Sequence, residues 1–407
     1  MASDNLSERL NRINGHIADG YRPVPASSLP SRYGKLAGAV GGELLAGEAG
    51  AFCLVRTAYE DGSRFGSCTL EPRSYDAHVP YACFTAGLSD GVACLSDLLF
   101  FDIETTGLGG AGTVPFLVGF GSLSPGGFEL RQYLLPDYSD ERGMLEHLAG
   151  ELTPDKTLVT YNGAAFDLNL LQDRLIINRV SREIEVQGHI DLLHATRRLF
   201  RRRLGDCTLA NVERELFGFF RQGDIPGYLI PSVYFSWLSE ERADDILNVL
   251  EHNRLDIFSL YFLLRHIVSV FASEGRELYD VDDVYSLSRV YGRRRQNDRV
   301  VNLLDGIQGT GGGAIEADIL LYQAQALKRA GKPEAAARLW EQLCGEKSRE
   351  GYRACIELAK YFEHQVRDVS RAYRHAQRAV QVCPYGETHK KDLRRRLKRL
   401  DSKLSRR

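Results

Sequence analysis

The sequence lacks two features that would connect it with a membrane or an export route. It has no uninterrupted run of the roughly 18 apolar residues that a membrane-spanning helix needs. Its first residues, MASDNLSERLNRINGH, lack the apolar segment of a secretory signal. We therefore expect a cytoplasmic protein that does not contact a membrane.

The eight cysteines show none of the spacings that mark a zinc site. They are scattered, with no CxxC pair and no Cys/His group at the spacing of zinc ligands. Scattered cysteines in a reducing compartment usually pack as small hydrophobic side chains. We therefore expect buried thiols here.

A strong overall charge is also missing, since the formal net charge is only −2. The basic residues are nevertheless unevenly distributed. Five arginines lie within residues 197–203, and the last 19 residues hold ten Lys or Arg against two Asp. Such local excess predicts a polyanionic partner, although the whole chain is not a polycation.

Three divisions follow from the pattern along the chain. Residues 1–95 have no clear role. The pattern predicts an α/β domain over residues 96–272 and a wholly helical domain over residues 280–407. In the middle division three strands follow one another through glycine turns, at residues 95–104, 116–123 and 128–135. Helices and a further strand come next, which predicts a mixed sheet flanked by helices.

The C-terminal division repeats with a period of about 35 residues. An alignment of its two clearest copies places Ala324 over Ala359 and Ala336 over Ala372. Small residues at this period are typical of tetratricopeptide-like helical repeats. The basic C-terminal helix has one leucine-lined face, and three roles stay open for it: capping the repeats, binding DNA or docking a partner.

The strand LLFFDIE ends in two carboxylates, Asp102 and Glu104. Side chains alternate along a strand, so both point to the same face. The glycine-rich TTGLGG that follows lets the backbone approach a ligand closely. An unpaired buried carboxylate is costly, so these two acids predict a cation at the strand end.

Two further segments carry acids at the borders of apolar elements. Asp167 lies in the first turn of a helix, directly after the strand LVTYNG. His252 and Asp256 are four residues apart and share one face of an otherwise apolar helix. A fifth acid, Asp191, also ends a strand-like segment, and we expect it either to support the metal-binding acids from behind or to have a structural role.

Together, these four acids suit hard divalent cations such as Mg²⁺ or Mn²⁺. Two such ions would stabilise the attacking and leaving oxygens of a phosphoryl displacement. A histidine beside the fourth acid could orient or deprotonate the attacking water. We therefore expect metal binding by Asp102, Glu104, Asp167 and Asp256, with His252 as a catalytic residue.

The segments FDIETTGL, YNGAAFD and HNRLD resemble the three motifs of the DEDD (DnaQ-like) 3′–5′ exonucleases, which have a ribonuclease H-like fold. The finer resemblance is to the YprB, or mitomycin-repair-factor-B, branch, which adds C-terminal tetratricopeptide-like repeats. It implies a two-metal 3′–5′ exonuclease acting on DNA in repair, beside a helicase or other repair partner. In the histidine subgroup of the DEDD exonucleases the catalytic His stands five residues before the last Asp, and in the tyrosine subgroup a Tyr stands four before it. In this sequence a histidine, His252, occupies the position four before Asp256.

Substrate contacts are expected at the strand ends and in the arginine run. Those near the ends are Thr105, Thr106, Leu108 and Asn162, and those in the run are Arg197, Arg198, Arg201, Arg202 and Arg203. Leu108 as a wedge against the terminal base is implied by the resemblance. Two alternatives remain: the same chemistry on RNA ends, and a repeat scaffold that recruits a repair partner with little nuclease activity of its own.

Overall fold

The computed structural model describes residues 20–71, 77–85, 90–107, 109–110, 112–182, 184–307 and 314–405. By their internal contacts the residues form two compact units. The first unit, here called the sheet domain, lies within residues 1–269 apart from 198–203. The second, here called the helical region, holds residues 198–203 and 270–407. Each is described separately below.

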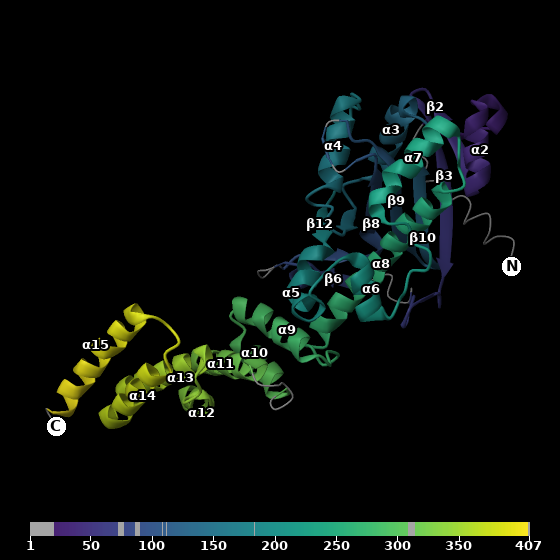
Figure 1. The fold of residues 1–407 in the computed structure, drawn as a ribbon. Coiled ribbons are helices and arrows are strands. Elements are labelled where there is room, and N and C mark those ends of the chain that lie inside the picture. Colours follow the sequence, from purple (N-terminus) through teal and green to yellow (C-terminus); the bar gives the residue numbers. More distant parts are fainter. Residues whose placement is uncertain are drawn as a thin grey trace. The chain divides into compact units, whose positions relative to one another are not determined.

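An eight-stranded sheet forms the centre of the sheet domain, in the order β1-β2-β3-β10-β9-β8-β11-β12 (Figure 1). The strands are β1 (Arg22–Pro23), β2 (Glu43–Gly47), β3 (Gly50–Glu60), β8 (Leu98–Thr105), β9 (Pro115–Ser124), β10 (Gly127–Leu134), β11 (Thr157–Thr160) and β12 (Gly188–Asp191). Neighbours from β1 to β8 pair antiparallel, while β11 pairs parallel with both β8 and β12. The sheet is therefore mixed, as the sequence predicts.

The boundary expected at residue 95 does not separate two bodies. β3 pairs with β10 along eight residues, from Glu60 opposite Gly127 to Cys53 opposite Leu134. Residues on both sides of the expected boundary thus belong to one sheet. Pairing between strands far apart in the sequence leaves no local pattern, which explains the difference.

The helices of the sheet domain lie on both faces of the sheet. They are α2 (Ser31–Val40), α3 (Glu141–Glu151), α4 (Asp167–Ile177), α6 (Leu209–Phe217) and α7 (Ile230–Glu240), together with α5 (Leu192–Leu204) and α8 (Ile246–Ala272), whose residues 198–203 and 270–272 belong to the helical region. Leu99, Phe101 and Ile103 of β8 share one core with α2, α3, α4 and α7. Phe100 faces the other way and packs edge-on against Tyr261 of α8.

Helix α8 is long and apolar enough to cross a membrane, judged by length and composition only. The expectation that the chain has no such stretch was too strict, since two charged residues within the stretch are compatible with a span. In the sheet domain 56% of that stretch is buried inside the protein. This burial is typical of a core helix, and one such helix is weak evidence for a span.

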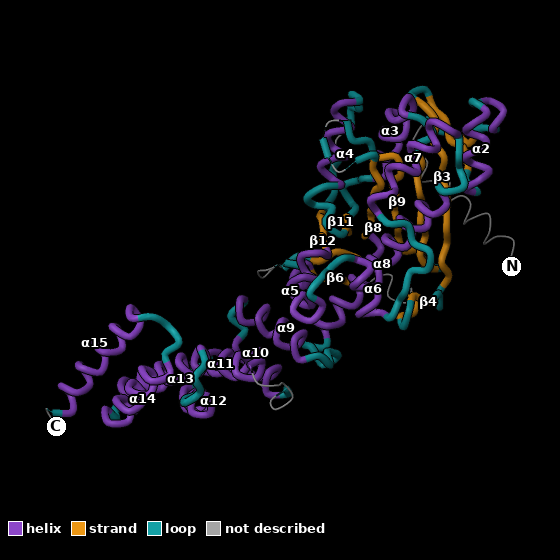
Figure 2. The backbone as a smooth tube through the Cα atoms, in the orientation of Figure 1, coloured by secondary structure: helices purple, strands orange, loops and turns teal. Residues whose placement is uncertain are grey.

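The helical region consists of helices joined by loops (Figure 2). They are α9 (Val281–Arg293), α10 (Asn297–Asp305), α11 (Ala314–Arg329), α12 (Pro333–Leu343), α13 (Arg349–Tyr361), α14 (Val369–Val382) and α15 (Glu387–Leu404), with a π-helical turn η7 (Phe362–Val366). Each packs against the next along the chain. The aligned alanines 324, 336, 359 and 372 are all fully buried. The predicted all-helical division is confirmed, and its tetratricopeptide-like character stays a prediction.

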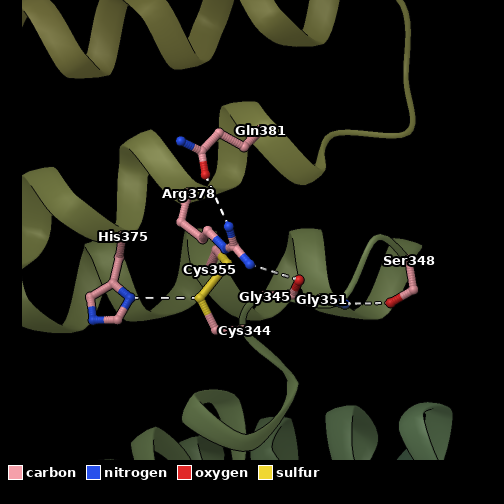
Figure 3. Close-up of a disulfide and its surroundings, with 8 residues drawn as sticks. All are labelled: Cys344, Gly345, Ser348, Gly351, Cys355, His375, Arg378 and Gln381. Carbon is pink, nitrogen blue, oxygen red and sulfur yellow. Dashed lines mark hydrogen bonds between the residues drawn. A yellow bond between two sulfur atoms is a disulfide. The ribbon is translucent and has the colours of Figure 1, made fainter.

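One disulfide corrects the expectation that the cysteines are thiols. Cys344, which caps the end of α12, is joined to Cys355 of α13, and the imidazole Nδ1 of His375 lies 3.6 Å from the Cys344 sulfur (Figure 3). The turn between α12 and α13 brings the two sulfurs together. Their separation of 11 residues matches no short motif, so the sequence offered no signal for the pairing.

Candidate active site

The two acids of β8 lie on the face of the sheet that α8 covers. Because the strand alternates, Asp102 and Glu104 point the same way as Phe100, which contacts Tyr261 of α8. The pairing with β9 becomes irregular between Glu104 and Thr105, where the strand ends. The sequence prediction of two carboxylates on one face, at a strand end, therefore agrees with the structure.

A glycine opposite Asp102 lets α8 approach the sheet. Gly119 of β9 pairs with Asp102, and a Cβ at Gly119 would lie 2.2 Å from the Ile257 side chain and 2.4 Å from Asn253 Oδ1. Any larger residue would push the helix away from the strand. The bare backbone at this position thus allows the acids of β8 and those of α8 to share one site.

Asp102 is held by a buried chain of amide groups. Asn253 donates from Nδ2 to Asp102 Oδ2 at 2.8 Å, and Gln132 donates from Nε2 to Asn253 Oδ1 at 2.9 Å. Both amide residues are essentially inaccessible to solvent. These contacts fix which carboxylate oxygen of Asp102 remains free. Sequence reasoning missed both residues, because a single Asn or Gln in an apolar element gives no distinctive pattern.

On α8, His252 and Asp256 lie on one face, as their spacing predicts. His252 Nε2 lies 3.7 Å from Asp256 Oδ2 and 3.9 Å from Glu104 Oε1. The other ring nitrogen, Nδ1, is 2.7 Å from Asp224 Oδ1. Asp224 therefore orients the imidazole so that Nε2 faces the carboxylates. Asp224 comes from the segment between α6 and α7 and was not predicted.

Arg221, from the same segment, brings a positive charge into the site. Its guanidinium donates to Asp256 Oδ1 and to both oxygens of Glu213, and it lies 3.2 Å from Asp224 Oδ2. The Arg221 side chain is only 6% exposed. The cation that the sequence predicted near the acids is thus partly supplied by the chain itself.

Asp167 begins α4 after a tight turn that follows β11. Gly163 is required in that turn, since a Cβ there would lie 2.7 Å from Thr160 Cβ and 2.8 Å from Asp167 Oδ2. Asp191, at the end of β12, accepts hydrogen bonds from the backbone N–H groups of Asn162, Ala164 and Leu193. Asp191 therefore holds the turn and the start of α5, which is the structural role we expect for it.

The four predicted acids influence one another electrostatically. Burial raises the pKa of Asp102 well above its ordinary value, and the carboxylates of Asp256, Glu104 and Asp167 raise it further. Burial likewise raises the pKa of Glu104 well above its ordinary value, and Asp256 and Asp167 add to the effect. Such mutual elevation means that these acids lie close enough to repel one another when ionised.

Asp167 shows the same effect in a less buried position. Burial, followed by the charges of Asp191 and Asp256, raises its pKa from 3.8 to about 7. Among the described residues, however, no three His, Cys, Asp or Glu side chains converge closely enough to hold a metal ion as they stand. The carboxylates of Asp102, Glu104, Asp167 and Asp256 fit a divalent cation in chemical type and in charge. In this structure, however, one oxygen of Asp256 accepts a hydrogen bond from Arg221.

The threonines expected to bind substrate use their hydroxyls within their own loop. Thr105 Oγ1 donates to the Gly107 carbonyl at 2.6 Å, and Thr106 Oγ1 accepts from the Val114 N–H at 2.9 Å. Asn162 is exposed with a positive φ of 72°. Leu108 lies outside the described residues. The threonines thus shape the loop after β8, and any contact they make with substrate would come from other atoms.

The arginine run of α5 is more engaged than its sequence suggests. Arg202 pairs with Asp282 and lies 3.7 Å from Asp318, and Arg203 Nε donates to Asp283 at 2.8 Å. Asp282 and Asp283 each lie 80 residues after the arginine they pair with, and Asp318 lies farther still, so the apparent lack of local partners was misleading. Burial lowers the pKa of Arg198, and Arg294 and Arg293 lower it further. Arg197 and Arg201 are exposed.

Comparison with known proteins identifies the domain that carries the site. Residues 99–268 match a family model of the RNase H superfamily. The chain is 32% identical over 320 residues to the uncharacterized protein YprB of Bacillus subtilis (strain 168), and the match covers 76% of each chain. Among solved structures, the family B DNA polymerase from the hyperthermophilic archaeon Pyrobaculum calidifontis matches with a TM-score of 0.35 and 17% identity. That match covers 63% of this chain and 34% of the polymerase.

Proposed function

The chain belongs to the YprB family and contains an RNase H superfamily domain, and from this premise we propose that it is a metal-dependent 3′–5′ exonuclease acting on DNA. One observation carries the proposal. Asp102 and Glu104 of β8, Asp167 of α4 and Asp256 of α8 come together from three separate elements. The pKa of each of the first three is raised, in part by the charge of Asp256. A domain core gains nothing from such an arrangement unless a cation neutralises it.

Asp102, Glu104, Asp167 and Asp256 would hold the metal, as one or two Mg²⁺ or Mn²⁺ ions. When bound, such ions neutralise charge on the phosphate and make a water molecule more acidic at neutral pH. Asn253 keeps Asp102 oriented toward the site through its 2.8 Å hydrogen bond. The hard oxygen donors favour these ions over softer metals that prefer Cys or His.

His252 is the residue best placed to accept the proton of the attacking water. Asp224 holds the Nδ1–H of the ring, which leaves Nε2 as the acceptor on the side of Glu104 and Asp256. The imidazole thus has a defined tautomer and a defined direction. Its position four residues before Asp256 does not prevent this role, because one helical turn keeps both side chains on the same face.

The direction of degradation, the preference for DNA and a role in repair beside a helicase rest on the resemblance of the three motifs. The exposed arginines Arg197 and Arg201 and the basic face of α15 offer charge for a polyanionic substrate. RNA is the closest alternative substrate, since none of the described contacts is specific for the 2′-hydroxyl.

The proposal is tested with 5′-labelled single-stranded DNA, duplex DNA and RNA of the same sequence. Each is incubated with Mg²⁺, Mn²⁺ or chelator, using the wild type, Asp102→Asn and the control Asp155→Asn. Asp155 is an acid of the same domain whose side chain is 68% exposed. We expect the wild type and Asp155→Asn to shorten DNA stepwise, and we expect chelator to abolish this activity. Asp102→Asn should be inactive under all conditions. Shortening of RNA alone would overturn the substrate, and no cleavage at all would favour a scaffold.

A further inference from the structure

The segment between α6 and α7 places one arginine among three carboxylates of the site. Arg221 contacts Glu213, Asp224 and Asp256, and its side chain is almost wholly buried. Neither the motifs nor the proposed chemistry requires an arginine at this position. A buried guanidinium on an acid that is expected to bind metal therefore calls for a physical explanation.

Glu213 anchors the guanidinium independently of Asp256. It accepts hydrogen bonds from Arg221 Nε and Nη2, both at 2.6 Å, and a third from the Ser259 hydroxyl. The Glu213 side chain has no solvent exposure. Two parallel bonds of this kind hold a guanidinium strongly and in one plane. Arg221 would thus keep its place even if Asp256 turned away from it.

Asp256, by contrast, has a choice of partners. Its Oδ1 accepts from Arg221, while its Oδ2 lies 3.7 Å from His252 Nε2, and the side chain is 19% exposed. An oxygen engaged by a guanidinium has fewer lone pairs for a metal. This engagement agrees with the lack of three convergent metal-binding side chains among the residues that the structure describes.

We propose that Arg221 is a built-in counter-cation for Asp256, which a divalent metal ion must displace in order to bind there. The inference rests on the proposed function, because it takes Asp256 as a metal ligand. In the metal-free protein Asp256 pairs with Arg221. In the metal-bound protein Asp256 would bind the metal, and Arg221 would keep its hydrogen bonds to Glu213. Arg221 is a positioning residue in this scheme, since it acts through Asp256.

Calorimetric titration of the full chain with Mn²⁺, without nucleic acid, measures this exchange directly. Arg221→Gln should bind Mn²⁺ about tenfold more tightly than the wild type, because one charge-assisted hydrogen bond no longer competes. Arg221→Lys keeps the positive charge but cannot bond Glu213 and Asp256 through a planar fork. It should therefore also bind more tightly, whereas a purely electrostatic effect would leave it at the wild-type affinity.

Two further variants separate competition from a general loss of stability. Arg131→Gln breaks a buried ion pair with Glu151 in the same domain, and it should leave the Mn²⁺ affinity unchanged. In an Asp256→Asn background, Arg221→Gln should no longer raise the affinity, because the competed oxygen has lost its charge. Circular dichroism checks that each variant is folded. If Arg221→Gln is unfolded, Arg221→Lys replaces it in the Mn²⁺ titration.

The outcomes distinguish this inference from the proposed function. If Asp102→Asn abolishes Mn²⁺ binding while both Arg221 variants bind like the wild type, the role of Arg221 is wrong and the metal site stands. If neither the wild type nor any variant binds Mn²⁺, both proposals fall. Binding that appears only in the Arg221 variants would support the competition strongly.

Discussion

Two clusters of ionisable side chains show opposite arrangements of charge. At the carboxylate site, formed by Asp102, Glu104, Asp167 and Asp256, four acids lie together. Arg221 pairs with Asp256 and lowers the pKa of Glu104. At the Glu363 cluster, in the helical region, one fully buried carboxylate receives Arg396 at 2.9 Å, Arg399 at 2.7 Å and Lys403 at 2.7 Å.

The pKa values of the two clusters move in opposite directions. Burial and like charges raise the pKa of Asp102, Glu104 and Asp167. Burial alone would also raise the pKa of Glu363, but the hydrogen bond from Lys403 and the charges around it bring the pKa below its ordinary value. A carboxylate surrounded by its own cationic partners stabilises the fold. A group of carboxylates that repel one another is suited to bind a cation. Four variants test this comparison.

Asp102→Asn should have the largest effect, and it should fall on activity. We expect the rate of DNA shortening to drop about a thousandfold, because several kcal/mol of metal-based transition-state stabilisation are lost. Single-turnover rates with saturating Mn²⁺ measure it. A rate within a fewfold of the wild type would mean that Asp102 does not hold a catalytic metal.

His252→Ala should reduce the same rate by about a hundredfold, since a positioned proton acceptor contributes on that order. The matched control is His194→Ala, because His194 is an exposed histidine of the neighbouring α5. Equal rates for His252→Ala and the wild type would show that His252 has no catalytic role. Such a result would not bear on metal binding by the four acids.

Glu363→Gln should change stability and leave catalysis at the site unaltered. Loss of the shared carboxylate leaves three cations without their acceptor, and we expect the free energy of unfolding to fall by about 2 kcal/mol. Urea unfolding followed by circular dichroism measures it. The control is Asp392→Asn in α15, the helix that carries the three basic partners of Glu363, because the Asp392 side chain is 76% exposed. Equal midpoints for the two variants would contradict the importance of the buried position.

Asp167→Asn should have the smallest effect, and it should raise the stability of the metal-free protein instead of lowering it. Between pH 3.8 and about 7 the folded carboxyl keeps a proton that the unfolded one has lost, so stability falls as the pH rises. Removing the acid should raise the melting temperature of the metal-free protein by about 2–4 °C at pH 8. The gain should shrink as the pH falls toward 4. A loss of stability at pH 8 would contradict the repulsion.

Local patterns were sufficient to predict much of the carboxylate site. Asp102 and Glu104 follow from strand alternation at an apolar strand end, and His252 and Asp256 follow from helical spacing. The three strands β8, β9 and β10 were predicted in order, because each is bounded by glycine turns. Such features depend only on residues near one another in the sequence.

The remaining features depend on contacts between residues far apart in the chain. Arg221 reaches Asp256 across 35 residues, and Gln132 reaches Asn253 across 121. Arg203 finds its acid 80 residues later. No periodicity or short motif encodes such pairs, because the fold alone brings them together. For the same reason, the pairing of β3 with β10 could not be predicted from local pattern.

If the four acids hold metal for hydrolysis at a free DNA end, cleavage should require both that end and Asp102. A 5′-labelled linear single strand and the same strand closed into a circle are incubated with Mn²⁺, with wild type and with Asp102→Asn. We predict that the wild type shortens the linear strand stepwise from its 3′ end and leaves the circle intact, and that the variant cuts neither. Cleavage of the circle, or equal activity of the variant, would contradict the account.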